Sequence, residues 1–91
     1  MLLKGETAVL TGCNRGIGKA LLEVFAKNGA NVWACVRIVN EDFNKYIANT
    51  AAKYNVNIMP VSFDLTNEIQ VKEGIKIIKA SKQPIDILVN N

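Results

Sequence analysis

The sequence contains no histidine and only two cysteines among its 91 residues. Without histidine, the chain lacks both the commonest general base of enzymes and the commonest metal ligand. Cys13 and Cys35 lack the spacing of a zinc site, so we expect both to be reduced small residues of a cytoplasmic protein. The sequence therefore excludes catalysis by histidine and predicts no metal site within this chain.

Strong net charge and long apolar runs are also missing. The formal net charge is +3 and only 21% of the residues are charged, which is too mild to predict a nucleic-acid partner. No apolar run approaches the roughly 20 residues that span a membrane, and the residues after Met1 do not resemble a signal peptide. We therefore expect one globular unit over residues 1–91, with neither a membrane nor a nucleic acid as its partner.

Three glycines, Gly12, Gly16 and Gly18, stand between an apolar run and an amphipathic run. A strand that turns at once into a helix needs backbone conformations that glycine adopts readily. The first N–H groups of a helix lack intrahelical partners, so they bind phosphate groups. We expect Gly12 to begin the turn, Gly16 to admit a pyrophosphate and Gly18 to pack the helix on the strand. The alternative is a plain glycine-rich connection.

Hydrophobic periodicity alternates between strand and helix along the whole chain. Strands are expected at residues 6–11, 31–37, 56–63 and 85–89, and helices at 17–27, from the cap Asn40 to Tyr54, and after the cap Thr66. The residues expected on the core faces of the helices are Ile17, Leu21, Leu22, Phe25, Phe43, Ile47, Ala51, Tyr54, Val71, Ile75 and Ile78.

This order predicts an α/β fold of the Rossmann type, β-α-β-α-β-α-β, with a doubly wound parallel sheet and strand order 3-2-1-4. Pro60 favours an edge position for the third strand, because proline cannot donate to a ladder. The strand order reverses between the first and fourth strands, and ligands bind at such a reversal. The glycine turn, Asp64 and Asn90 all follow strands, so we expect them at one rim.

The end of the second strand predicts which nucleotide binds. In NAD-binding domains of this kind an acidic residue there holds the ribose 2′-hydroxyl. Arg37 stands at that place, about 20 residues after Gly18, and an arginine pairs with a 2′-phosphate instead. Arg15 in the glycine turn could reach the same phosphate, so the sequence favours NADP over NAD. The alternative is that both arginines are solvated surface residues.

Three motifs resemble those of the short-chain dehydrogenase/reductase family, over the whole chain. Thr11-Gly12-x-x-x-Gly16-x-Gly18 is similar to the family's cofactor motif, and Asp64 to its adenine-contacting aspartate. Asn90-Asn91 resembles the opening of its Asn-Asn-Ala-Gly motif. The glycine turn is most like that of the 3-oxoacyl-acyl-carrier-protein reductases. The resemblance implies an NADP-dependent oxidoreductase that moves a hydride between nicotinamide and a carbonyl or alcohol.

The resemblance also implies a cofactor site built from the glycine turn and the strand ends. Its expected members are Thr11, Gly12, Asn14, Arg15, Gly16, Ile17, Gly18, Arg37, Asp64, Leu65 and Asn90. Asp64 would accept from the adenine amino group beside the Leu65 backbone, and Asn90 would brace the sheet near the cofactor. The alternative for Asp64 is a residue that approaches the next helix, and for Asn90 a polar strand end.

The catalytic residues implied by the resemblance are missing from the 91 residues. The family's serine and Tyr-x-x-x-Lys pair follow the fourth strand, and neither Tyr46 nor Tyr54 is followed four residues later by lysine. The chain is therefore predicted to be the amino-terminal part of one dinucleotide-binding domain, inactive by itself. The full protein is expected to be a cytoplasmic dimer or tetramer acting on a small-molecule or acyl-carrier-bound carbonyl. Alternatives are a non-catalytic nucleotide-binding module and an S-adenosylmethionine-binding fold, which fits Arg37 poorly.

Overall fold

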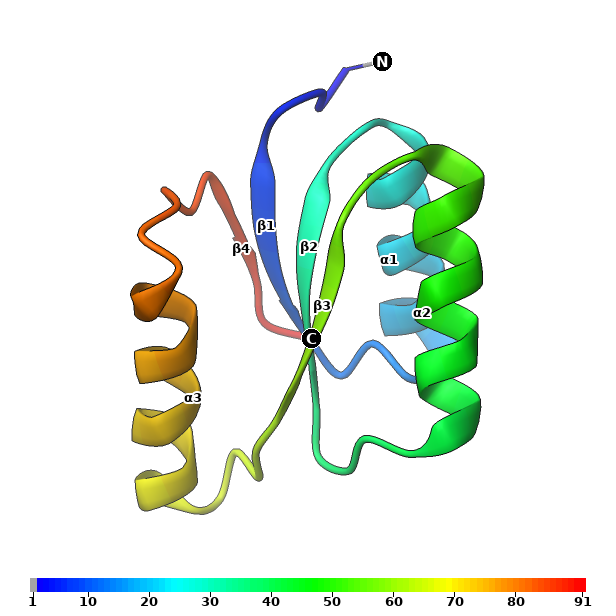
Figure 1. Ribbon diagram of the computed structural model, residues 1–91. Coiled ribbons are helices and arrows are strands. Elements are labelled where there is room, and N and C mark those ends of the chain that lie inside the picture. The colour runs from blue at the N-terminus through cyan, green and yellow to red at the C-terminus, as the bar shows by residue number, and fades with distance from the viewer. Residues whose placement is uncertain (1) are drawn as a thin grey trace.

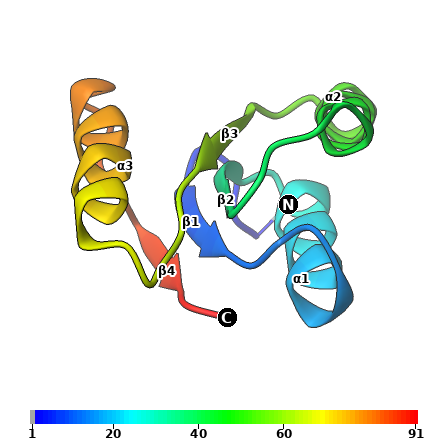
Figure 2. The same ribbon diagram turned by 90° about the horizontal axis from the view of Figure 1, so that it is seen from below.

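The computed structural model describes residues 2–91 as a parallel sheet with helices on both faces (Figures 1 and 2). The strands are β1 (Thr7–Thr11), β2 (Asn31–Val36), β3 (Ile58–Ser62) and β4 (Ile87–Val89). The helices are α1 (Gly16–Lys27), α2 (Glu41–Tyr54) and α3 (Glu68–Ala80). Within the described residues, no helix is both long and apolar enough to cross a membrane. The predicted α/β fold and its strand order 3-2-1-4 are confirmed.

Strand β1 lies inside the sheet because its side chains are buried on both faces. It pairs in parallel with β2 from Thr7 to Thr11, and with β4 over only three residues. A strand with an apolar centre, here Ala8, Val9 and Leu10, that is buried on both faces suits the middle of a parallel sheet. Pro60 lies in β3 at the sheet edge, so the predicted edge position is also confirmed.

The core has two parts because side chains alternate between the two faces of each strand. Val32, Ala34 and Val36 of β2 belong to the cluster that packs against α1 and α2. Trp33 and Cys35 belong to the cluster under α3. Figure 2 shows the arrangement, with α1 and α2 on one face of the sheet and α3 on the other. The predicted core position of Trp33 is confirmed, with 8% of the residue exposed.

The start of α2 follows the prediction, whereas that of α3 does not. The Asn40 side chain accepts a hydrogen bond from the Phe43 amide at 2.8 Å, which caps α2. The predicted cap of α3, Thr66, is wrong. Asn67 caps that helix, because α3 begins one residue later than a cap at Thr66 would set, and the Asn67 side chain accepts from the Gln70 amide at 3.2 Å.

Two residues expected on core faces are exposed, so these predictions are wrong. Ile17 is 73% exposed in the first turn of α1, where Gly18 is the buried residue. Ile75 is 44% exposed on α3, and its neighbour Gly74 is buried instead. Helical spacing predicts which residues share a face of a helix. The position of the helix against the sheet then determines which of those residues the sheet buries.

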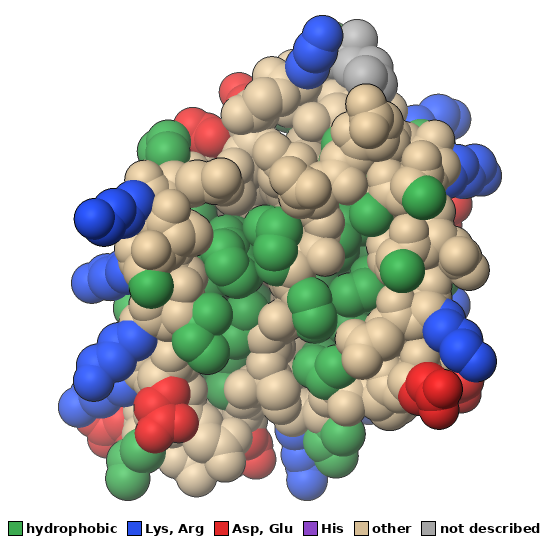
Figure 3. Space-filling view, in the orientation of Figure 1, with side chains coloured by type: hydrophobic (Ala, Val, Ile, Leu, Met, Phe, Trp, Pro, Cys, Tyr) green, Lys and Arg blue, Asp and Glu red, His purple; other side chains and the backbone are tan. Residues whose placement is uncertain are grey.

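All four strands are shorter than expected, and the difference is largest for β3 and β4. Strand β3 begins at Ile58 and β4 at Ile87, two residues later than predicted in each case. Before β4, the Asp86 carboxylate accepts a hydrogen bond from the Thr7 amide at 2.9 Å. The Asp86 amide in turn donates to the Thr7 carbonyl at 2.9 Å, so two hydrogen bonds join these residues just before β4 begins. The lysines of α3 are exposed as expected, and Figure 3 shows positive side chains along that side of the molecule.

Candidate functional site

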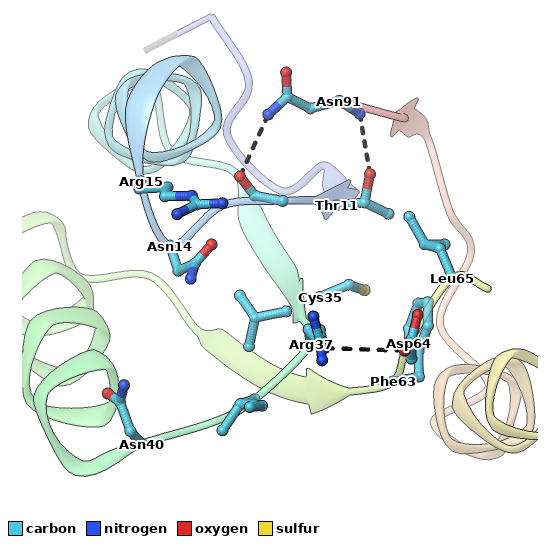
Figure 4. Close-up of a pocket in the computed structure, with 13 residues that line it drawn as sticks. Thr11, Asn14, Arg15, Cys35, Arg37, Asn40, Phe63, Asp64, Leu65 and Asn91 are labelled. Atoms are coloured by element: carbon cyan, nitrogen blue, oxygen red, sulfur yellow. Dashed lines mark hydrogen bonds and ion pairs between the residues drawn. The ribbon is translucent and has the colours of Figure 1, made fainter. Parts of the chain in front are cut away.

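A cavity of about 560 Å³ opens where the carboxyl ends of the strands meet, beside the reversal between β1 and β4 (Figure 4). Of the predicted site residues, it brings together Thr11, Gly12, Asn14, Arg15, Arg37, Asp64 and Leu65. Gly16, Ile17, Gly18 and Asn90 do not line it. The rim predicted from the strand ends is therefore formed by the glycine turn and the residues that follow β2 and β3.

The glycine turn has the backbone geometry that its residue types predict. Gly12 has φ +63° and Gly16 has φ +59°, and residues with a Cβ atom rarely adopt such positive values. Gly18 has no such angle, but a Cβ there would overlap the carbonyl oxygen of Gly12. The Gly12 amide donates to the Cys35 carbonyl at 3.0 Å, which ties the turn to β2.

Helix α1 begins differently from the other two helices of the described chain. Its first flanking residue, Arg15, is extended and makes no side-chain capping bond, whereas Asn40 and Asn67 cap α2 and α3. The uncapped amides of a first turn carry partial positive charge and bind anions. The start of α1, next to the cavity, therefore offers donors that can bind a phosphate group.

The end of β4 is fastened to the end of β1 by three hydrogen bonds. The Thr11 hydroxyl donates to the Asn90 side-chain oxygen at 3.0 Å and accepts from the Asn91 amide at 3.0 Å. The Asn91 side chain donates to the Gly12 carbonyl at 3.3 Å. Asn91 lines the cavity and Asn90 does not, so the second asparagine of the pair is a site residue that the sequence prediction missed.

Arg37 and Asp64 face each other at the mouth of the cavity (Figure 4). The Arg37 Nε lies 3.9 Å from an Asp64 carboxylate oxygen, and the two side chains are 78% and 34% exposed. The Ser62 hydroxyl donates to the Arg37 carbonyl at 2.9 Å and fixes the end of β2. An exposed pair at this distance contributes little stability, so the Arg37 guanidinium remains available to a ligand.

The Asp64 carboxylate is held in its ionised form. One of its oxygens accepts from the Thr66 amide at 2.9 Å and from the Thr66 hydroxyl at 2.7 Å. These hydrogen bonds, with a smaller contribution from Arg37, hold the pKa of Asp64 below its ordinary value. Asp64 therefore forms the approach to α3, as its alternative interpretation expected, and also lines the cavity.

The cavity carries two cationic side chains and one carboxylate. Arg15 projects from the glycine turn, Arg37 follows β2, and Asp64 supplies the negative charge (Figure 4). The residues that the sequence prediction missed are neighbours of these, namely Cys35, Val36, Ile38, Asn40, Phe63 and Asn91. Their position beside strand ends was the signal that could have found them. A site with this lining suits a polyanion that also carries an apolar or aromatic group.

The two thiols take no part in the cavity chemistry. Cys13 is completely buried, and burial raises its pKa to about 12. Burial likewise raises the pKa of Cys35 to about 11. Cys13 packs in the cluster under α1 and α2, whereas the Cys35 side chain packs on the other face of the sheet. Both are therefore inert core residues at neutral pH.

Residues 6–91 match the family model described as short chain dehydrogenase. The chain is 34% identical over 92 residues to sorbitol dehydrogenase from Cereibacter sphaeroides. The matched region covers 100% of this chain and 34% of that protein. It is 30% identical over 87 residues to dehydrogenase/reductase SDR family member 11 from Gallus gallus, covering 96% of this chain and 34% of that one.

A solved structure supports the same relationship. L-sorbose reductase from Gluconobacter frateurii, complexed with NADPH and L-sorbose, superimposes with a TM-score of 0.88 at 32% identity. The match covers 98% of this chain and 34% of that chain. Among the first curated relatives, the chain spans between 28% and 37% of their length.

Proposed function

The chain belongs to the short chain dehydrogenase family, and on that premise we propose that its cavity binds NADP(H) as the cofactor part of an oxidoreductase. One observation carries the proposal. Gly12 of the glycine turn and the two arginines line one cavity at the reversal of the strand order, and the uncapped start of α1 follows directly after Arg15. Phosphate groups need donors and positive charge, and this cavity supplies both.

In this proposal the pyrophosphate lies against the glycine turn. Gly12 and Gly16 keep the backbone free of side chains, and the amides around Ile17 and Gly18 in the first turn of α1 donate to the phosphate oxygens. Thr11 fixes the turn through its bonds to Asn90 and Asn91. Asn14 lines the same wall of the cavity.

The 2′-phosphate of the adenosine is proposed to lie between Arg15 and Arg37. An arginine pairs with a phosphate through two parallel hydrogen bonds and has no acceptor for a ribose hydroxyl. The NADPH in the L-sorbose reductase structure supports this choice of cofactor. The adenine is proposed to lie beside Asp64, which accepts from its amino group, and the Leu65 backbone.

The whole protein is proposed to move a hydride between the nicotinamide and a small-molecule carbonyl or alcohol. The bound cofactor supplies the hydride chemistry, and the residues of this chain bind and orient it. Relatives that act on sorbitol and L-sorbose support a sugar or polyol substrate. An acyl-carrier-bound 3-oxoacyl group is the alternative that the glycine turn suggests. A cytoplasmic location and a dimeric or tetrameric assembly stay predictions.

The test is to measure cofactor binding and turnover separately. The 91-residue chain is expected to bind NADP⁺ more tightly than NAD⁺ and to show no turnover, because it contains no Tyr-x-x-x-Lys pair. A chain that binds neither nucleotide contradicts the proposal.

The missing pair also keeps a non-catalytic nucleotide-binding module as the second candidate. Turnover by the protein that carries this chain, with NADP(H) and a ketose or polyol, excludes that candidate.

A further inference from the structure

Helix α3 has one fully covered residue, Gly74, and the Phe63 ring covers it. A Cβ built on Gly74 would lie 2.6 Å from Cδ1 and 2.9 Å from Cε1 of Phe63. Atoms of side chains in contact are separated by about 3.5–4.0 Å. The ring therefore occupies the space that any side chain at Gly74 would need.

Phe63 also lies at the end of the cavity where the adenine is proposed to bind. It follows β3, lines the cavity and precedes Asp64 and Leu65 (Figure 4). Only 8% of Phe63 is exposed, and its ring packs in one cluster with Trp33 and Val61. The ring thus lies between α3 and the sheet, in a residue that also lines the cavity.

We propose that Gly74 is a positioning residue for the adenine end of the nucleotide site, because its missing side chain lets the Phe63 ring lie against α3 and out of the cavity. This inference rests on the proposed function. Gly74 itself does not line the cavity, so its effect passes through Phe63. The contact makes adenine affinity depend on a helix residue outside the site.

The chain has two ways to accommodate a methyl group at Gly74, and both disturb the same place. The ring can turn toward the cavity, which narrows the adenine end. Alternatively, α3 can move outward, but the Gln70 side chain of α3 accepts a hydrogen bond from the Asp64 amide at 2.9 Å. An outward shift of the helix therefore displaces Asp64 or breaks that bond.

The test compares Gly74→Ala with the wild-type chain for two ligands. Adenosine 2′,5′-bisphosphate probes the adenine end, and inorganic pyrophosphate probes the glycine turn alone. Gly74→Ala is expected to weaken binding of the bisphosphate about tenfold, as overpacking does, and to leave pyrophosphate binding unchanged. Ile77→Ala, at an exposed position of the same helix, is the control and is expected to change neither.

A second substitution tests whether the effect passes through Phe63. Phe63→Val added to Gly74→Ala makes room for the methyl group, so bisphosphate affinity is expected to return to within about threefold of that of Phe63→Val alone. Trp33 is the single tryptophan of the chain and shares the Phe63 cluster. Its fluorescence is therefore expected to shift in Gly74→Ala without any ligand.

The outcomes separate this inference from the proposed function. Equal bisphosphate affinity in Gly74→Ala and wild type overturns the inference, as does an equal loss for both ligands. Where Gly74→Ala alone does not fold, the double variant decides, and an unfolded double variant also overturns it. A wild-type chain that binds neither ligand overturns the proposed function instead, whatever the fluorescence of Trp33 shows.

Discussion

The Thr11 hydroxyl donates a hydrogen bond to the Asn90 side chain at 3.0 Å, joining residues that lie 79 positions apart. The same hydroxyl accepts from the Asn91 amide at 3.0 Å. Strand β4 pairs with β1 over only three residues. These two bonds extend that short ladder and hold the end of β4 beside the glycine turn.

Thr11→Val keeps the shape of the side chain and removes both bonds. We expect it to lower the free energy of unfolding by about 1 kcal/mol, because Thr11 is buried but its partners Asn90 and Asn91 are exposed, so water can replace the lost bonds to them. Urea titration followed by circular dichroism measures the change. Thr7→Val, in the same strand, is the control, because the Thr7 hydroxyl makes no hydrogen bond within residues 2–91. Equal losses in the two variants would show that the tie contributes nothing.

Two glycines of the turn, Gly16 and Gly18, are expected to respond differently to alanine. Gly16→Ala meets open space but must adopt φ +59°, which costs about 1–2 kcal/mol. Gly5→Ala has the same kind of strain at φ +82°, far from the cavity, and is the matched control. Both are expected to lose similar stability in urea, but only Gly16→Ala is expected to lose affinity for NADP⁺.

Gly18→Ala is expected to be the most damaging of these substitutions. Its methyl group meets the backbone carbonyl of Gly12, which no rotation of a side chain can relieve. We therefore expect a larger loss of stability than in Gly16→Ala, measured in the same urea titration. A Gly18→Ala chain as stable as wild type would mean that α1 does not pack on the turn as described.

The lowered pKa of Asp64 makes the free energy of unfolding depend on pH. Its pKa in the folded chain is held below the ordinary 3.8 by Thr66 and, to a lesser degree, by Arg37. The carboxylate therefore stabilises the folded chain fully above about pH 5, and this contribution is lost as the pH falls through 3.8 and below. The difference in the free energy of unfolding between wild type and Asp64→Asn, measured by urea titration, is therefore expected to become smaller over that pH range. A difference that grows on acidification contradicts the assignment.

The buried thiols predict slow chemistry. Thiolate is the reactive form, and pKa values of about 12 and 11 leave almost none at pH 8. The native chain is expected to react with Ellman's reagent only as fast as it unfolds, and to show two thiols in denaturant. Rapid reaction of the native chain would contradict the burial of the two thiols. A Cys13–Cys35 disulfide formed within the native chain under mild oxidation would contradict their placement on opposite faces of the sheet.

Most of the fold could be predicted from the sequence because local patterns determine it. Apolar runs such as Val32–Val36 become buried parallel strands, and Pro60 marks the edge strand. What failed depends on distant parts of the chain. Ile17 has helical spacing but is exposed in the first turn of α1, and Asn67 rather than Thr66 caps α3 because the helix begins one residue later than expected.

The site was predictable in part for the same reason. Residues that directly follow strands, such as Arg37 and Asp64, were found because parallel strands end at one rim. Asn91 and Phe63 also follow strands, but they were missed because their residue types carry no signal of the contacts that they make, with the Gly12 carbonyl and with Gly74. A buried glycine inside a helix carries no sequence signal of the ring that it accommodates.

Arg37 is proposed to help a 2′-phosphate to bind in the cavity. The most direct measurement is isothermal titration of wild type, Arg37→Gln and the remote control Lys79→Gln with NADP⁺ and NAD⁺. We predict that wild type and the control prefer NADP⁺ by about tenfold or more, and that Arg37→Gln removes most of the preference by weakening NADP⁺ alone. An unchanged preference in Arg37→Gln, or no preference in wild type, would mean that Arg37 does not bind the 2′-phosphate.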